Sequence, residues 1–408
     1  MVLEMRKLKD SGIEWIGEIP ESWSIARGKH ILTLLQRAVF PTDGVITCFR
    51  DGEVTLRSNR REDGFTVSLK EIGYQGIEPG DLVVHGMDGF AGSIGISDSR
   101  GKSSPVLVVL DSSQDKKYLM YYLRSMAYNN VFLALSTGIR VRSCDLKWNK
   151  LADLLYLVPP IVEQHKLVSF LDEKCSEIDA MLSKTRASIE EYKKLKQAVI
   201  TQAVTTLNCP NVKLKYLMDI IVDCPHETPI YTFTGNYLVI RTSDQSLASL
   251  RCDEHMYRLD EAEYKKRTRR LTLDKDDIVY GREGSWGLAC LVPQSNKYCL
   301  GQRVMQFRCN TRLLYPKYAM YALNSETVYM QGALDTIGST APHVNISTIC
   351  NYLLPVPALT EQKEITNYLD AKCAEIDRLI AKKEQLVKEL ESYKKSLIYE
   401  VVTGKREV

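Results

Sequence analysis

The chain lacks the features that would place it in a membrane or outside the cell. Its 408 residues contain no run of 18 or more apolar residues, so no membrane-spanning helix is expected. The first ten residues are charged and include no apolar stretch, so we expect no secretory signal. Eleven cysteines are scattered without a C-x-x-C pair, which predicts reduced thiols and a cytoplasmic location.

Recognisable catalytic motifs are missing as well. The six histidines form no H-E-x-x-H and no pair with metal-ligand spacing, so no metal site is expected. G-x-G-x-x-G and G-x-S-x-G are absent, and the segment from Gly95 to Ser103 has one residue too many for a phosphate-binding loop. We therefore expect no catalytic residues and no bound cofactor, and we do not expect this chain to be an enzyme. A scaffold or recognition role is favoured.

What the chain does contain is a long internal repeat. Residues 159–205 and 357–403 align without a gap at an offset of 198 residues, and 16 of 47 positions are identical. Chance at average composition would give roughly three identities. The chain is therefore interpreted as two similar halves, each ending in the same element.

The repeated element is predicted to be a long amphipathic helix, because apolar residues recur every seven positions in two rows. Lys196 and Lys394 interrupt one row at the same repeat position, and such polar residues can fix the register of a coiled coil. About 43 helical residues would span roughly 65 Å, which is the length of a spacer. The first copy's rows are Leu171, Ile178, Thr185, Tyr192 and Val199, and Cys175, Leu182, Ile189, Lys196 and Ala203.

The rest of the chain predicts two α+β domains of similar plan. We expect a first globular domain over residues 1–157, a helical region over 158–206, a second globular domain over 207–354 and a second helical region over 355–408. Short β-rich runs alternate with turns in each globular part, and helices are expected near 117–127, 145–154 and 317–323. One local match is clear: the strands at 81–84 and 277–280 are each followed by three glycines spaced three apart.

Charged clusters favour nucleic acid as a partner. Basic groups in both halves, in regions expected to be rich in loops, would neutralise phosphates, and residues on the glycine-rich loops would read base edges. A solvated face is the alternative for each basic group, and core packing is the alternative for Trp286. The candidate DNA-binding residues are Arg57, Arg60, Arg61, Met87, Asp88, Phe90, Arg140, Arg142, Lys265, Lys266, Arg267, Arg269, Arg270, Arg282, Glu283, Ser285 and Trp286.

These residues and motifs resemble the specificity subunit of Type I restriction-modification systems over nearly the whole chain. The resemblance rests on Pro159 and Pro357, each followed four residues later by Glu-Gln, and on the Leu-Asp-x-Lys-Cys-x-Glu-Ile-Asp that continues each copy. The segment Gly-Ile-Glu-Trp-Ile-Gly-Glu-Ile-Pro-Glu-Ser-Trp at 12–23 is also typical of that family.

The resemblance implies a fold and a mechanism. Two target-recognition domains would be held by two conserved helices, which pack as an antiparallel coiled coil with a pseudo-two-fold axis. Each domain would read half of a bipartite, asymmetric site in double-stranded DNA, and the helices would set the gap. Two modification subunits would bind S-adenosylmethionine and methylate adenine at N6, and restriction subunits would use ATP and Mg. Lys174, Glu177, Lys372 and Glu375 are candidate contacts for those partners, with solvated charge as the alternative.

Two other interpretations stay open. The heptads alone would also fit a coiled-coil adaptor that joins two protein-binding modules and has no DNA role. An enzyme with an unrecognised active site is the third. Salt-sensitive binding to duplex DNA separates the first interpretation from the adaptor.

Overall fold

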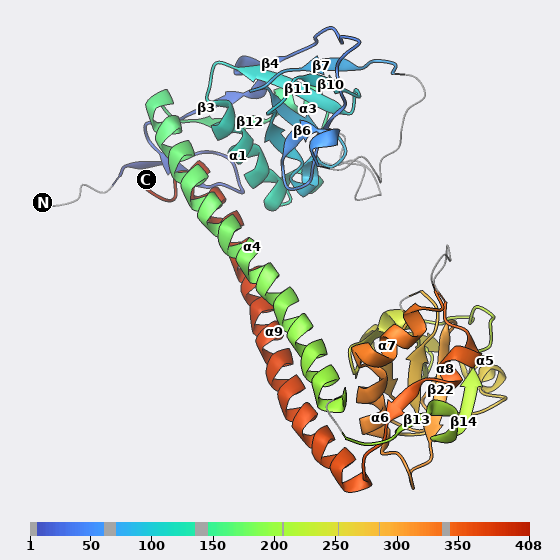
Figure 1. The fold of residues 1–408 in the computed structure, drawn as a ribbon. Coiled ribbons are helices and arrows are strands. Elements are labelled where there is room, and N and C mark those ends of the chain that lie inside the picture. Colours follow the sequence, from blue (N-terminus) through green and yellow to red (C-terminus); the bar gives the residue numbers. More distant parts are fainter. Residues whose placement is uncertain are drawn as a thin grey trace, which may run out of the picture. The chain divides into compact units, whose positions relative to one another are not determined.

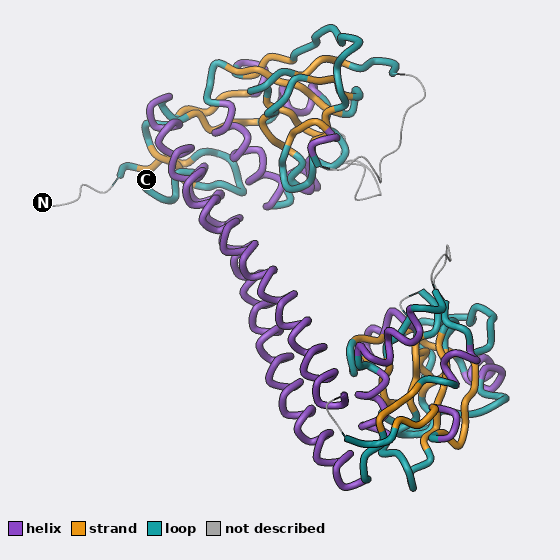
Figure 2. Tube along the Cα trace, in the orientation of Figure 1, coloured by secondary structure: helices purple, strands orange, loops and turns teal. Residues whose placement is uncertain are grey.

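The computed structural model divides the chain into two compact units. It describes residues 6–60, 71–134, 146–205, 208–251, 253–284, 286–336 and 343–408. One unit comprises Met1–Lys184 with Leu386–Val408, and the other comprises Thr185–Gln385. Both unit boundaries fall within the two longest helices, α4 (Ile161–Thr205) and α9 (Leu359–Val402) (Figures 1 and 2). The repeat thus predicted both helices correctly.

The first unit is built on a four-stranded antiparallel sheet with the strand order β4-β11-β8-β9. Its two central strands are apolar and almost wholly buried, as expected for strands covered on both faces. Helix α1 packs on this sheet with nine buried side chains. The sheet strands are β4 (Leu32–Leu34), β8 (Leu82–His85), β9 (Ile94–Ile96) and β11 (Leu107–Ser112).

Smaller elements complete this unit. Four two-stranded ladders surround the central sheet: β1 (Leu8–Asp10) with β2 (Glu18–Pro20), β3 (Ser24–Arg27) with β12 (Leu155–Val158), β5 (Ile46–Cys48) with β6 (Val54–Leu56), and β7 (Gln75–Ile77) with β10 (Gly101–Ser103). The helices are α1 (Lys116–Tyr128), α2 (Val131–Ala134) and α3 (Trp148–Asp153). Helices were predicted near 117–127 and 145–154, and α1 and α3 occupy those places.

The second unit repeats the central sheet. The antiparallel order β14-β22-β19-β20 corresponds strand for strand to that of the first unit. The strands are β14 (Met218–Asp223), β19 (Ile278–Gly281), β20 (Ala289–Leu291) and β22 (Val304–Cys309). In the place of α1 there are two shorter helices, α6 (Pro316–Leu323) and α7 (Glu326–Ala333), because the helix is interrupted at Asn324 and capped again by Ser325.

The additional elements of the second unit differ from those of the first. A three-stranded sheet with the order β18-β15-β21 contains a parallel pair, and a short hairpin lies nearby. The strands are β15 (Tyr237–Ile240), β16 (Gln245–Ser246), β17 (Ser249–Leu250), β18 (Tyr257–Leu259) and β21 (Tyr298–Leu300). The helices outside the α6–α7 pair are α5 (Glu261–Arg267) and α8 (Ile346–Cys350).

Both units close their globular part in the same way. In each unit an early strand of the globular part pairs with the strand that leads into the long helix: β3 with β12 in one, and β13 (Asn211–Lys213) with β23 (Leu353–Pro355) in the other. The tyrosine hydroxyls of Tyr118 and Tyr318 donate to carbonyls of these exit segments, Leu157 at 3.2 Å and Pro355 at 2.9 Å. Each globular part therefore starts and ends beside its long helix.

The ends of the two long helices are buried in the hydrophobic cores of the units. The first turns of α4 and the last turns of α9 lie in the core of the first unit, and the converse holds in the second. Ile200 and Val204 of α4 are fully buried, as are their repeat equivalents Ile398 and Val402. Burying such side chains contributes about 1.5–3 kcal/mol each. The predicted row was wrong here: Val199 and Ala203 are only partly buried, because packing on a globular core follows the 3.6-residue period.

The two lysines in the helix rows have matching partners. In the second unit the Lys196 ammonium lies 2.8 Å from an Asp377 carboxylate oxygen, and the Lys196 side chain is only 9% exposed. In the first unit Lys394 pairs with Asp179 at 2.6 Å. Lys394 and Asp377 are the repeat equivalents of Lys196 and Asp179, so each copy supplies the same lysine and the same aspartate. A buried ammonium needs such a partner.

The N-terminal segment packs onto the first unit through its tryptophans. Trp23 is 1% exposed and lies in the core of the first unit, and the Trp15 carbonyl accepts from the Tyr399 hydroxyl at 3.0 Å. These contacts anchor the N-terminal segment to the first unit. Within the described residues, no helix is both long and apolar enough to cross a membrane. The predicted segments 65–69, 137–142 and 337–340 lie outside the described residues.

Candidate nucleic-acid interface

The glycine-rich loop of the first unit is held by a histidine. It follows β8, and Nδ1 of His85 accepts hydrogen bonds from the backbone N–H groups of Met87 (3.3 Å) and Asp88 (3.0 Å). Burial lowers the pKa of His85, so the ring stays neutral and can act as an acceptor. Met87 is 49% exposed at the tip, whereas Phe90 packs against the core. Of the loop candidates in this unit, Met87 is the one presented to solvent.

The corresponding loop of the second unit is more enclosed. Arg282 is 8% exposed and lies between two carboxylates, with its Nε 3.4 Å from Asp223 and its Nη2 2.7 Å from Glu283. Glu283 forms a backbone bridge with His343. The guanidinium therefore braces this loop against β14 in the observed conformation. Ser285 lies outside the described residues.

Trp286 belongs to the core of the second unit. It is 8% exposed and stacks on Tyr329, with ring centroids 4.3 Å apart and planes 3° apart. Gly287 beside it has φ +91°, and an added Cβ would come within 2.6 Å of the Tyr329 ring. The arrangement supports the core-packing interpretation of Trp286, and its contact with DNA stays a prediction.

The basic group of the first unit is neutralised internally. Arg60 pairs with Asp51 at 2.6 Å and Glu53 at 2.9 Å and lies over the Phe49 ring. Arg57 Nε donates to the Thr47 hydroxyl at 3.2 Å. Asp88, a candidate of opposite charge, pairs with Arg50 at 3.2 Å. Three further candidates, Arg61, Arg140 and Arg142, lie outside the described residues.

The larger basic run requires a correction. It was expected in a loop, but Lys265, Lys266 and Arg267 form the last turn of α5, because Asp260 caps that helix and its cations complement the C-terminal dipole. Arg267 is 7% exposed and donates to the carbonyls of Leu300, Glu227 and Pro225. It therefore holds the segment after β14 in place. Arg269 and Arg270 are exposed.

The remaining cations of the run are available to a polyanion. Lys265 pairs with Glu261 at 2.7 Å and Lys266 with Glu227 at 2.9 Å, and all four side chains are more than 60% exposed. Exposed ion pairs of this kind stabilise a protein by about 0–1 kcal/mol, so exchanging a carboxylate for a phosphate costs little. Together with Arg269 and Arg270 they make the most accessible basic surface among the candidates that the structure describes.

Two exposed aromatic side chains were not among the candidates identified from the sequence. The segments that follow the equivalent strands β4 and β14 present Phe40, which is 55% exposed, and Phe233, which is 101% exposed. Phe40 covers the Arg100 guanidinium at 4.6 Å, while Tyr231 and Tyr257 lie edge to face near Phe233 on the second unit. A large aromatic residue among Pro, Thr and Gly after a strand was the available signal.

The candidate partner contacts on the long helices lie in local ion pairs. Lys174 bonds Glu177 at 3.0 Å, and Lys372 bonds Glu375 at 3.2 Å, each three residues apart on one helix face. All four side chains are between 37% and 52% exposed. The same pair thus recurs at equivalent positions of both copies, and partner binding by it stays a prediction.

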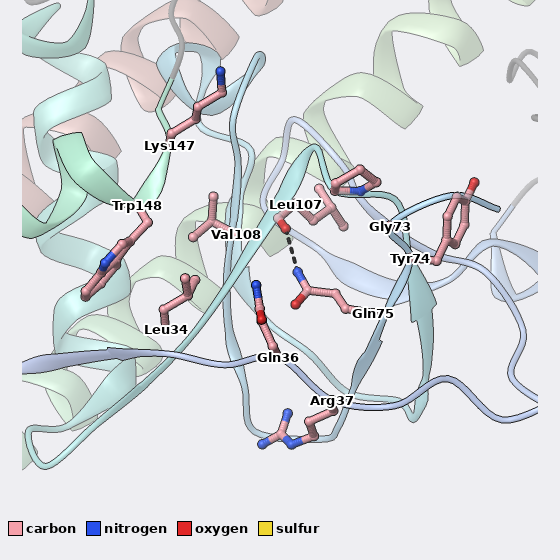
Figure 3. Close-up of a pocket in the computed structure, with 11 residues that line it drawn as sticks. Leu34, Gln36, Arg37, Gly73, Tyr74, Gln75, Leu107, Val108, Lys147 and Trp148 are labelled. Atoms are coloured by element: carbon pink, nitrogen blue, oxygen red, sulfur yellow. Dashed lines mark hydrogen bonds between the residues drawn. The ribbon is translucent and has the colours of Figure 1, made fainter.

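The cavities of the two units differ in charge. In the first unit, a cavity of 590 Å³ has Arg37, Lys147, Tyr74 and Trp148 in its wall, and Figure 3 shows the Gln75 amide donating to the Leu107 carbonyl within it. In the second unit, a cavity of 640 Å³ has four aspartates and three cations in its wall: Asp219, Asp274, Asp276 and Asp277, with Lys275, Arg308 and Lys363.

Among the described residues, one group has metal-ligand chemistry. Asp223, Cys224 and His226 place ligand atoms within 4.8 Å of one another. Asp223, however, already accepts from His226 at 3.0 Å and pairs with Arg282. Burial raises the pKa of the Cys224 thiol, which opposes formation of the thiolate a metal needs. The group is explained as a hydrogen-bonded cluster at the end of β14.

Comparison with known proteins relates this chain to DNA specificity subunits. Residues 223–390 match the family described as the Type I restriction modification DNA specificity domain. The EcoBI specificity subunit of Escherichia coli, a Type I restriction enzyme, is 26% identical over 130 residues, which are 32% of this chain and 27% of that protein. The aligned region therefore spans about a quarter of that relative's length.

Solved structures extend the likeness to the whole fold. A chain from the structure described as "Structural basis underlying complex assembly and conformational transition of the type I R-M system" has a TM-score of 0.71 and 15% identity, covering 95% of this chain and 99% of that one. The HsdS subunit from Thermoanaerobacter tengcongensis has a TM-score of 0.50 and 15% identity, covering 97% and 100%. Residues 223–390 thus match the Type I restriction modification DNA specificity domain, and the fold of the chain as a whole resembles that of an HsdS subunit.

Proposed function

We propose that this chain is the DNA-specificity subunit of a Type I restriction-modification complex. Each globular part reads one half of a bipartite, asymmetric site in double-stranded DNA. The observation that carries the proposal is the duplicated architecture: two equivalent sheets on two equivalent helices, with three strands of one sheet within the region that matches a DNA specificity domain. A duplicated reader fits a site with two specified halves.

In this proposal the long helices form an antiparallel coiled coil with a pseudo-two-fold axis and hold the half-sites apart. With 45 and 44 residues, each helix is about 66 Å long. The reciprocal Lys196–Asp377 and Lys394–Asp179 pairs support this arrangement, because a two-fold relation between the copies would generate one pair from the other. Helix length then sets the unspecified gap, as geometry fixes half-site spacing in other DNA readers.

The chemistry belongs to partner subunits. Two modification subunits bind S-adenosylmethionine and methylate adenine at N6 after flipping the base, and restriction subunits use ATP and Mg for translocation and cleavage. This chain contributes DNA recognition and docking surfaces, among them Lys174, Glu177, Lys372 and Glu375. The exposed cations at 265, 266, 269 and 270 contact phosphates, and Met87 lies at the base edges.

Methylation mapping tests the proposal. The chain is expressed with its cognate modification subunit in a host without DNA methylation, and the genome is sequenced for N6-methyladenine. A single split motif with a fixed gap is the expected result. A continuous motif would contradict two half-site readers. For the coiled-coil adaptor, the purified chain with its modification subunit would show no salt-sensitive binding to duplex DNA.

The helical spacer has its own test. Inserting seven residues into each long helix, at equivalent positions of the exposed middle, lengthens the pair by about 10 Å, or about three base pairs. The methylated motif should keep both halves and gain a longer gap. An unchanged gap would exclude the helices as the ruler.

A further inference from the structure

The first turns of each long helix carry a buried glutamine with the same set of partners. Gln164 is fully buried; its Oε1 accepts the Asp115 N–H at 2.9 Å, and its Nε2 donates to the Gln114 side chain and the Pro159 carbonyl, both at 2.8 Å. Asp115 caps α1, so this glutamine joins the start of α1 to the start of α4.

The second copy repeats this arrangement. Gln362 is fully buried; its Oε1 accepts the Tyr315 N–H at 2.7 Å, and its Nε2 donates to the Leu313 and Pro357 carbonyls at 2.9 Å. Tyr315 precedes α6 as Asp115 precedes α1. The glutamine of each Glu-Gln motif therefore serves the same junction in both units.

An aspartate two turns further along makes a second junction. One carboxylate oxygen of Asp172 accepts from the Tyr121 hydroxyl at 2.8 Å, and the other accepts from the Lys117 ammonium at 2.6 Å. Asp370 does the same with Tyr321 at 2.8 Å and Lys317 at 2.6 Å. Both tyrosines are about 5% exposed, so their hydroxyls depend on these carboxylates for a partner.

Two junctions eight residues apart prevent rotation about either one. Eight helical residues span about 12 Å, and α1 or α6 is held at both ends of that distance. Helix α1 or α6 is thus one of the elements through which each globular part meets the long helix of its own half. We call the set of Gln164 and Asp172 with their partners, and its counterpart with Gln362 and Asp370, the Gln–Asp clamp.

We propose that the Gln–Asp clamp sets the angle at which each recognition domain stands on the long helices and thereby fixes the gap length between half-sites. This inference rests on the proposed function and adds positioning residues to it. The clamp residues do not read bases. They act on spacing because a domain that rocks about its junction moves its DNA-binding loops along the duplex, and one base pair corresponds to only about 3.4 Å.

The experiment removes the aspartate junction from either side. Asp172→Asn changes the acceptor on α4, whereas Lys117→Met with Tyr121→Phe removes both donors on α1 and preserves the shape of the buried ring. Each variant is co-expressed as the full chain with its cognate modification subunit in a host lacking DNA methylation. The readout is the fraction of genomic sites methylated at gaps one base pair shorter and longer than that of the wild type.

Both variants should methylate the same two half-sites with a relaxed gap. We expect the ratio of methylation at the neighbouring gaps to methylation at the wild-type gap to rise about tenfold, because the variants discriminate less between spacings. Combining Asp172→Asn with the α1 substitutions should add little, because the groups act as one unit. Asp370→Asn should relax the gap in the same way from the second unit.

Two controls separate positioning from plain stability and charge. Glu173→Gln neutralises the adjacent carboxylate, which is 65% exposed and bonds only Lys174 among the described residues. Ile77→Val weakens the same globular part in a separate core, remote from the clamp. Neither control variant should alter the methylated gap, even where its thermal stability is as low as that of the clamp variants.

The outcomes are distinct. A sharp wild-type gap in both clamp variants would overturn the inference, as would equal relaxation by Ile77→Val. Altered half-site bases with an unchanged gap would also overturn it and would make the clamp part of base reading. If the wild type gives no split motif, the proposed function itself fails, whatever the variants do.

Discussion

The two globular parts agree where they meet the long helices and differ elsewhere. Both have the same four-stranded order, the same closing ladder and the same Gln–Asp clamp. They differ in the surrounding ladders, in the α6–α7 interruption and in the chemistry of the glycine-rich loop, where His85 of one unit corresponds to Gly281 of the other. A duplicated reader needs identical docking and different reading surfaces. Under the proposed function, this pattern of agreement predicts a recognition surface away from the clamp.

The largest expected difference between the units concerns their third loop glycines. Gly92 and Gly287 both have positive φ, +96° and +91°. An added Cβ lies 3.3 Å from the Tyr128 ring in the first unit but 2.6 Å from the Tyr329 ring in the second. We expect Gly287→Ala to lower the free energy of unfolding by about 3 kcal/mol and Gly92→Ala by about 1.5 kcal/mol. Urea titration measures both, and equal losses would show that the Tyr329 stack yields easily.

The reciprocal helix pairs should differ by a smaller amount. Asp377→Ala leaves the Lys196 side chain, which is 9% exposed, without its partner. Asp179→Ala does the same to Lys394, which is 23% exposed. We expect losses of about 2 and about 1 kcal/mol, since an unpaired charge costs more when it is more buried. Adding Lys196→Met to Asp377→Ala should restore most of the stability. Thermal unfolding of the wild type, the two aspartate variants and the double variant measures these losses. If the double variant recovers no stability, the explanation by unpaired charge is contradicted.

If the basic surface of the second unit contacts DNA phosphates as proposed, its DNA affinity should fall as the salt concentration rises. Arg269→Ala with Arg270→Ala should reduce the slope of log affinity against log salt by about 1.8, with a loss of affinity of about tenfold for specific and non-specific DNA alike. Arg312→Ala, exposed on the same unit, is the matched control. Binding to labelled duplexes at several salt concentrations measures the slopes. A loss confined to one sequence would instead assign these arginines to base reading.

The smallest expected effect is a pH response of the first unit alone. Burial lowers the pKa of His85 below its ordinary 6.5, Asp88 opposes this shift, and Arg50 adds to it. Because the unfolded chain binds this proton more readily, the neutral ring contributes stability that is fully present above pH 6.5 and declines as pH falls below it. Between pH 7.5 and 5.5 we expect His85→Gln to remove under about 1 kcal/mol of this dependence, as urea unfolding can show.

The second unit offers the comparison for that response. The position equivalent to His85 is Gly281, which does not titrate, and burial raises the pKa of Tyr280 beside it far above this range. Tyr280→Phe should therefore leave the dependence on pH between 5.5 and 7.5 unchanged. If His85→Gln and wild type respond identically, the loop does not depend on the neutral ring.

Much of the fold followed from periodicity. The long helices, α1, α6 and the central strands of both sheets appear where apolar spacing indicated, because burial of one face leaves a regular mark on the sequence. The site was harder to predict. Arg267, Arg282 and Trp286 resemble surface or ligand-contacting residues in the sequence, yet each is under 9% exposed, because only the fold supplies the carbonyls, carboxylates and ring that surround it.

The sequence by itself determined the duplication, the helix lengths and the identity of Gln164, Asp172, Lys196 and their equivalents. It contained no statement of their partners on other elements, since these lie between 47 and 215 residues away in the chain. Only the tertiary structure decided that the glutamine and aspartate bind α1 or α6 while the lysine meets the other long helix. The physical reason is that local periodicity reports which face is buried, whereas the choice of neighbour for a buried polar group depends on contacts that close long loops.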